Sequence, residues 1–161
     1  MDGDRLDRDR IGALLAAMVR HTRPVPSDRL GVIGDDHLRA RLLAMGVEPE
    51  SFRYSRKAAK CKTARSGGGE RANFIPWVLE SAFGYLGDAA DRRRIYTGAN
   101  WSAAIGNPFR TFGETGEGLE SALADMRATS GEPVVFVLHL AHPRVEYTDR
   151  GKSAIVIGGG A

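Results

Sequence analysis

Apolar residues recur at helical spacing in three parts of the chain, each followed by a residue that ends helices. The first stretch shows Ile11, Leu14, Leu15 and Met18 on one side of a helix. The other two stretches have apolar residues three or four positions apart and are followed by glycine. Helices are therefore predicted from Asp7 or Asp9 to about His21, from an Asp35 or Asp36 cap to Gly46, and over 119–126 with a stop near Gly131.

Strands are predicted in four segments of different character. Val134–Ala141 is apolar on both faces, so we expect it in the middle of a sheet. Apolar residues alternate in Phe74–Tyr85, which favours a strand, although Pro76 would also suit the first turn of a helix. Segments 52–61 and 93–101 are the other two predicted strands.

The order of these elements predicts an α+β domain. We expect a mixed sheet of about four strands with helices packed on one face. The Gly-rich segment 102–118 is expected to be a loop. If two of the strands are parallel neighbours joined through a helix, the general rule favours a right-handed crossover.

Composition limits the class of protein without naming a function. The 161 residues are enough for one domain, and 42% hydrophobic and 27% charged residues are ordinary for a globular protein. A net charge of +3 permits contact with nucleic acid. Cys61 has no second cysteine to pair with, and the charged N-terminus does not resemble a signal peptide. We expect a cytoplasmic protein without a membrane span.

Four segments carry a resemblance to a known family, in the family's order. They are PSDRLGVIGDD at 26–36, ANFIPWVLESAFGY at 72–85, RIYTGANW at 94–101, and a C-terminal strand that leads through Tyr147 to Gly151-Lys152-Ser-Ala-Ile155. These resemble the P-[ST]-x-D-x-L-x-P-I-G-E-E entry, the G-x-P-F-x-[VI]-E-x-x-[IF]-A-Y strand, the R-x-A-N-x-[IV]-P-L strand, and the V-H-x-A strand with its G-K-[ES]-x-I loop. The family is the transducer domain of type IIB DNA topoisomerases, found in the B subunit of topoisomerase VI.

The resemblance implies a fold and a division of the chain. An N-terminal amphipathic helix would cover 1–23, the transducer-like domain 24–157, and a flexible tail 158–161. The family's β-α-β crossover is left-handed, which is opposite to the general rule.

The resemblance also implies a function that is not catalytic in this chain. Lys152, beside Gly151, would touch the terminal phosphate of ATP, which is held with Mg by a GHKL-type ATPase domain in cis or in trans. DNA and a topoisomerase A-like subunit would be further partners. The chain lacks the family's ATPase domain and its long C-terminal helix, and it would bind no cofactor alone.

Two glycine-containing motifs resemble nucleotide-binding loops but match them only in part. Asp149-Arg-Gly151-Lys152-Ser153 resembles a phosphate-binding P-loop, but Glu146 stands where the P-loop has its first glycine, so we reject that interpretation. A solvated lysine in a turn is the alternative to the sensor role. The loop 113–118 fits G-x-x-G-x-G of the GHKL-type fold, yet the other motifs of that fold are missing from the sequence. We expect a plain loop and no ATP hydrolysis by this chain alone.

A basic segment offers a second function. Six cations occur without an intervening acid: Arg53, Arg56, Lys57, Lys60, Lys62 and Arg65. They could bind DNA phosphates with marked salt dependence, or they could be the solvated cations of an edge strand. A free-standing basic nucleic-acid-binding α+β domain is therefore the alternative function.

No other constellation makes an active site. His139 and His142 are the closest histidine pair, but no cluster completes a metal site, and His139 is expected to be a satisfied core or interface residue. No G-x-S-x-G motif is present, so no nucleophile is assigned. Trp101, next to Asn100, is expected in the core, with stacking on a partner as the alternative.

Overall fold

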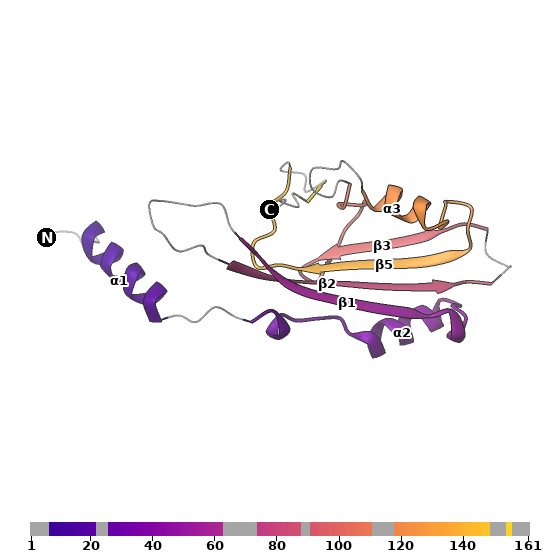
Figure 1. Cartoon of the computed structure of the whole chain (residues 1–161), viewed down its shortest axis with the longest axis horizontal. Coiled ribbons are helices and arrows are strands. Elements are labelled where there is room, and N and C mark those ends of the chain that lie inside the picture. Colours follow the sequence, from indigo (N-terminus) through magenta and orange to yellow (C-terminus); the bar gives the residue numbers. More distant parts are fainter. Residues whose placement is uncertain are drawn as a thin grey trace, which may run out of the picture.

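The computed structural model describes residues 7–21, 26–62, 74–87, 91–110, 118–148 and 154–155. Five strands make one mixed sheet, with a helix against each of its faces (Figure 1). The elements are α1 Arg8–His21, α2 Asp35–Ala44, β1 Arg53–Lys62, β2 Phe74–Tyr85, β3 Arg94–Ala99, β4 Ser102–Ala103, α3 Leu119–Asp125 and β5 Val134–Ala141. Two short 3-10 turns, Ser27–Arg29 and Pro49–Ser51, flank α2.

The strand order is β1-β2-β5-β3-β4, which places β5 in the middle of the sheet as its apolar sequence predicted. β1, β2 and β5 are antiparallel neighbours, whereas β3 runs parallel to β5. The α+β class with a mixed sheet is therefore confirmed. The sheet has one strand more than expected, because the two-residue β4 folds back on β3 within the segment that the sequence assigned to a loop.

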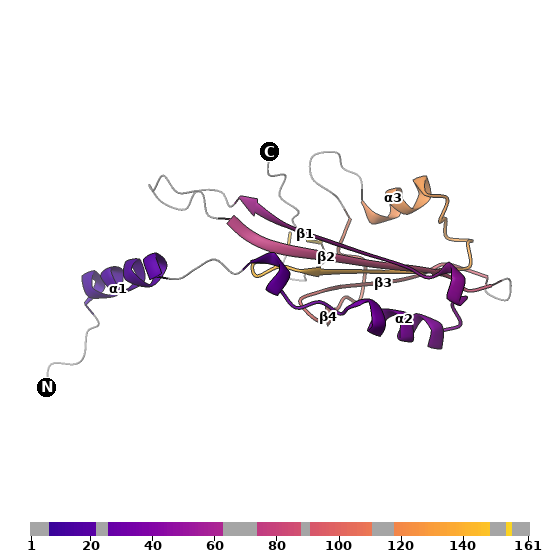
Figure 2. The same cartoon turned by 60° about the horizontal axis from the view of Figure 1, so that its bottom comes forward.

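The two helices that pack on the sheet cover opposite faces, which differs from the expectation of helices on one face. On one face, Leu42 of α2 lies in a core cluster with Val135 of β5. On the other, Leu123 of α3 packs in a cluster with Leu138 of the same strand. Figure 2 shows α2 and α3 on opposite sides of the sheet. Since β5 is apolar on both faces, both faces need cover.

β3 and β5 are adjacent parallel strands, and the chain between them passes through α3. This is a β-α-β unit of the kind that the resemblance implies. The left hand of its crossover stays a prediction.

The helix boundaries follow the sequence closely. α1 and α3 form where the apolar period predicted them, and α2 ends just before Gly46. The cap of α2 is Gly34, one residue before the expected aspartates. Apolar side chains of α1, among them Leu14 and Met18, are exposed. Among the described residues, no helix combines the length and the apolarity needed to cross a bilayer.

The two faces predict which leucines stabilise the fold. Leu42 is 2% exposed and Leu14 is 61% exposed. Leu42→Ala should lower the free energy of unfolding by about 2–5 kcal/mol, because it leaves a cavity beneath α2. Leu14→Ala should change it by less than about 0.5 kcal/mol. Urea denaturation of the two variants measures both changes, and equal losses would contradict the packing of α2 against the sheet.

Candidate functional site

The most unusual feature of the sheet is a buried carboxylate on β2, beside the central strand. Glu80 of β2 has no exposed surface. Its Oε1 accepts hydrogen bonds from the Gly34 N–H at 2.9 Å and the Tyr54 hydroxyl at 2.8 Å. Its Oε2 accepts from the Ile33 N–H at 2.8 Å and lies 2.9 Å from Nδ1 of His139. Four donors therefore surround one buried charge, which is what a buried carboxylate needs to remain ionised.

The segment before α2 is shaped to reach this carboxylate. Gly34 has φ of 91° and ψ of 155°, a conformation open essentially to glycine alone, and it caps α2. Two successive backbone N–H groups, of Ile33 and Gly34, point at Glu80. They lie at the N-terminal, electropositive end of α2, where a negative charge is favourable. The start of α2 is thus fixed by a charge in β2.

Burial and hydrogen bonds together set the ionisation of Glu80 and Tyr54. Burial by itself would raise the pKa of Glu80, but hydrogen bonds from Gly34, Ile33, His139 and Tyr54 outweigh it and lower the pKa. Burial, the hydrogen bond to Glu80 and the charge of Glu80 together raise the pKa of Tyr54 to about 12. The site therefore holds an ionised carboxylate and a neutral phenol at neutral pH.

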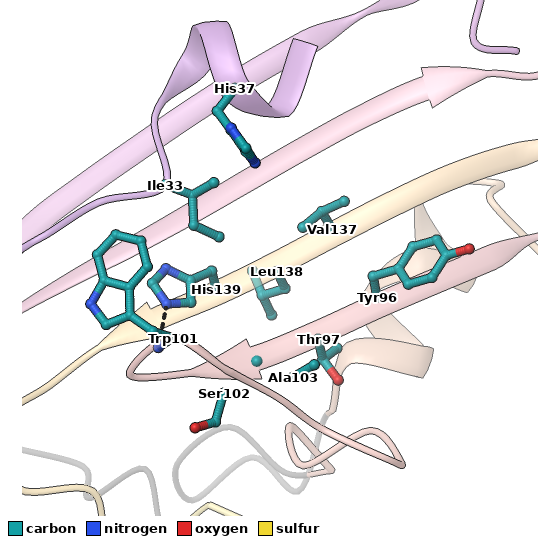
Figure 3. A pocket seen from close by; sticks show the side chains of 11 residues that line it. Ile33, His37, Tyr96, Thr97, Trp101, Ser102, Ala103, Val137, Leu138 and His139 are labelled. Atoms are coloured by element: carbon teal, nitrogen blue, oxygen red, sulfur yellow. Dashed lines mark hydrogen bonds between the residues drawn. The ribbon is translucent and has the colours of Figure 1, made fainter. Parts of the chain in front are cut away.

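His139 continues the network into the next strands. It is 3% exposed, and its Nε2 accepts a hydrogen bond from the backbone N–H of Trp101 at 3.3 Å. Since Nε2 needs a free lone pair for this bond, the hydrogen-bond pattern assigns the proton to Nδ1, which donates to Glu80. The expectation of a satisfied core histidine is confirmed. Figure 3 shows the Trp101 to His139 bond as a dashed line.

The strand register aligns these residues in a single row across the sheet. Arg56 pairs with Glu80, Glu80 with His139, and His139 with Gly98. Gly98 in turn pairs with Ala103 of β4. Because paired residues share a face, the row lies on the α2 side and joins all five strands.

The convergence at Glu80 also joins three of the segments that carry the family resemblance. Segment 26–36 supplies the two backbone donors, segment 72–85 supplies the carboxylate, and β5 supplies His139. These partners are 46 to 59 residues apart in the chain. Sequence reasoning missed Glu80 as a site residue. One signal was available in the sequence. Glu80 is the one acidic residue in the largely apolar segment 74–85, and the predicted central strand contains His139 as a polar residue that could pair with it.

The predicted phosphate sensor, Lys152 with Gly151, lies outside the described residues, but the two ends of its loop do not. Tyr147 bridges Ile155, and the Thr148 N–H donates to the Ala154 carbonyl at 2.9 Å. The Ile155 N–H also donates to the carbonyl of residue 108 at 2.8 Å. The loop that carries Lys152 is therefore closed at its base.

The chain between β5 and this loop is held by Asn100. Its side chain donates from Nδ2 to the His142 carbonyl at 2.8 Å and accepts at Oδ1 from the His142 N–H at 2.9 Å. The Asn100 backbone N–H donates to the Leu140 carbonyl at 2.9 Å. Burial lowers the pKa of His142, although the charge of Glu146 opposes this.

The basic segment forms β1, an edge strand of the sheet. Its described basic side chains are all exposed: Arg53, Arg56, Lys57 and Lys60. Lys62 is the last residue of β1, and its side chain is not described, while Arg65 lies outside the described residues. The strand alternation puts Arg56 and Lys60 on the α2 face and Arg53 and Lys57 on the other. Both faces of one edge therefore carry positive charge.

No metal or hydrolytic site emerges from the described ranges. They contain no group of three His, Cys, Asp or Glu residues placed to hold a metal ion. The loop 113–117 is outside them, and Gly118 caps α3. The geometry instead shows a buried hydrogen-bond network that positions the segment before α2 and the turn between β3 and β4.

Comparison with known proteins assigns no family. The sequence matches no family model, and a search of curated proteins gives no match. Support for a function therefore comes from the residues and from the order of the motifs.

The network predicts a specific effect of pH on stability. Because the pKa of folded Glu80 lies below its ordinary value of 4.5, the unfolded state takes up this proton first as the pH falls. The contribution of Glu80 is therefore complete above about pH 4.5 and is lost as the pH falls through the lowered pKa. Glu80→Gln should cost about 2–5 kcal/mol at pH 7 and should show a smaller further loss between about pH 7 and pH 3.

Tyr54→Phe is the matched control for this prediction. It removes one of four donors to Glu80 and keeps the charge, so it should cost about 1 kcal/mol at pH 7 and retain most of the acid dependence of the unmodified chain. Urea denaturation at several pH values makes the comparison. A Glu80→Gln variant as stable as the unmodified chain at pH 7 would refute the role of the carboxylate.

Proposed function

We propose that this chain is a non-catalytic, transducer-like module of a type IIB topoisomerase B-subunit-like protein. It couples ATP binding by a GHKL-type ATPase domain to DNA handling by a partner, for which a topoisomerase A-like subunit is the candidate. The observation that carries the proposal is the convergence on Glu80 of three segments that resemble the transducer family. Motifs that match by chance have no reason to meet at one buried carboxylate.

The position of β5 supports the part of the proposal that concerns Lys152. β5 is the central strand, and its Val135 is fully buried. Asn100 fixes the chain just after β5, and the bridge between Tyr147 and Ile155 closes the loop beyond it. A lysine on such a loop has a fixed base and a flexible, compact charge, which suits contact with a terminal phosphate. ATP and its Mg would be held by the separate domain.

The proposal gives this chain a mechanical task. A phosphate contact at Lys152 would bias the position of the loop and of the sheet behind it, and the packed helices would move with the sheet. A cytoplasmic location belongs to the same proposal, since ATP-dependent DNA handling takes place there.

The sensor role is tested in the presence of a GHKL-type ATPase domain that binds this chain, fused to it or added to it. Lys152→Ala should lower ATP turnover by on the order of a hundredfold, because a charge that stabilises the transferred phosphate is removed. The charge-matched control is Lys57→Ala on β1, which should leave turnover unchanged. Thermal unfolding of both variants should match that of the unmodified chain. Equal turnover in Lys152→Ala and the control would refute the sensor role.

A second function is favoured by a different observation. Four exposed cations lie along the edge strand β1, on both of its faces. None of these four cations takes part in a salt bridge with another described residue. A free-standing basic domain that binds nucleic acid through β1 therefore remains the alternative function.

This alternative is tested by the salt dependence of duplex DNA binding. Replacing Lys57, Lys60 and Lys62 by Ala should weaken binding and reduce the slope of log K against log salt concentration by about 0.9 for each phosphate that is no longer neutralised. A variant with Arg10, Arg41 and Arg144 replaced by Ala removes the same charge from scattered, exposed positions. It should keep most of the slope. Equal effects of the two variants would show that β1 is not the binding surface.

A further inference from the structure

An open pocket of about 420 Å³ lies between α2 and the part of the sheet that α2 leaves uncovered. Ile33 and His37 come from the segment before α2 and from α2 itself, and Val137 and His139 of β5 lie on the floor (Figure 3). Tyr96 comes from β3 and Trp101 from the turn after it, and the two rings lie at opposite ends of the pocket (Figure 3). None of the residues that line the pocket is a lysine, arginine, aspartate or glutamate. The lining is therefore largely apolar and aromatic, as in sites that bind a ring.

The two large aromatic side chains of this pocket are exposed. Trp101 is 62% exposed, so the expectation that it lies in the core is wrong, and Tyr96 is 48% exposed. Trp101 also occupies a position that normally belongs to glycine. It is the second residue of the two-residue turn between β3 and β4, where Asn100 has φ of 47° and Trp101 φ of 67°. Turns of this form strongly prefer Gly at that place, so the indole is kept at a cost in backbone strain.

The structure holds the indole in one place. The backbone N–H of Trp101 donates to His139, and the two rings lie 5.4 Å apart at 50°. Gly31 lies directly beneath the indole, since a Cβ built on Gly31 would come within 2.6 Å of it. His139 is fixed in turn by Glu80. A ring that is already ordered loses little entropy when it binds another ring.

We propose that this pocket receives an aromatic side chain from a protein partner. The volume accommodates one such side chain, and aromatic anchors in apolar pockets are typical centres of protein interfaces. The described lining contains no lysine or arginine, which argues against a nucleotide, whose phosphates need cations. The cations of β1 lie at the opposite edge of the sheet, with β2, β5 and β3 between them and β4. This inference is independent of the sensor role of Lys152.

The test is an NMR titration of the full, ¹⁵N-labelled chain with N-acetyl-tryptophanamide, and separately with adenosine. N-acetyl-tryptophanamide should shift the amide signals of Gly98, Trp101 and Ser102 and saturate with a Kd on the order of a millimolar. Trp101→Gly should weaken this binding at least about tenfold. Glycine suits the turn, so this variant removes the ring while its thermal stability stays equal or rises.

Two further variants make the test decisive. Tyr96→Ser removes the second ring from an exposed position and should also weaken binding of N-acetyl-tryptophanamide. Met126→Ala, at an exposed apolar residue after α3, should leave binding unchanged. Absence of saturable shifts at these amides would overturn the proposal. Tighter binding of adenosine than of N-acetyl-tryptophanamide would also overturn it, since the site would then prefer a nucleobase.

Discussion

The arrangement of this protein depends on the hydrogen bonds around one buried carboxylate. A charge without solvent contact is very costly unless donors replace the water that formerly solvated it. Glu80 has four such donors, from the segment before α2, from β1 and from β5. Because each donor would be left unpaired without the carboxylate, the four segments are fixed together. Apolar packing alone would tolerate a sliding of α2 along the sheet, whereas paired N–H groups do not.

The same network connects the two surfaces that could contact partners. From Glu80 the hydrogen bonds run through His139 to the backbone of Trp101, which stands at the edge of the aromatic pocket. The neighbouring Asn100 holds the chain that leaves β5 toward the loop of Lys152. The turn between β3 and β4 thus touches both the pocket and the exit of β5. His142, just after β5, is hydrogen-bonded to Asn100, and Asn100 is covalently joined to Trp101. A displacement of the chain at His142 would therefore be passed to the indole.

The sequence predicted best those features that depend on the residues of a single helix or strand. The apolar run of β5 predicted its central place, and the apolar period and Gly46 predicted the extent of α2. Periodicity gives the face of a strand that is buried, but not the element that covers it, so the placement of α2 and α3 on opposite faces was missed. β4 was missed because it has two residues and follows a tryptophan in a conformation typical of glycine. The contacts of Glu80 join residues up to 59 positions apart, and local pattern does not encode such distances.

The candidate site was predicted only in part, for a related reason. The sequence indicated that β5 leads to a lysine loop, and the closed base of that loop agrees with a fixed attachment, while the role of Lys152 stays a prediction. The basic strand β1 is one edge of the sheet, whereas the chain that leads to Lys152 leaves the central strand β5. The row of Arg56, Glu80 and His139 joins that edge to the central strand, so the basic edge and the chain that leads to Lys152 are connected through one buried network rather than through separate units of the fold.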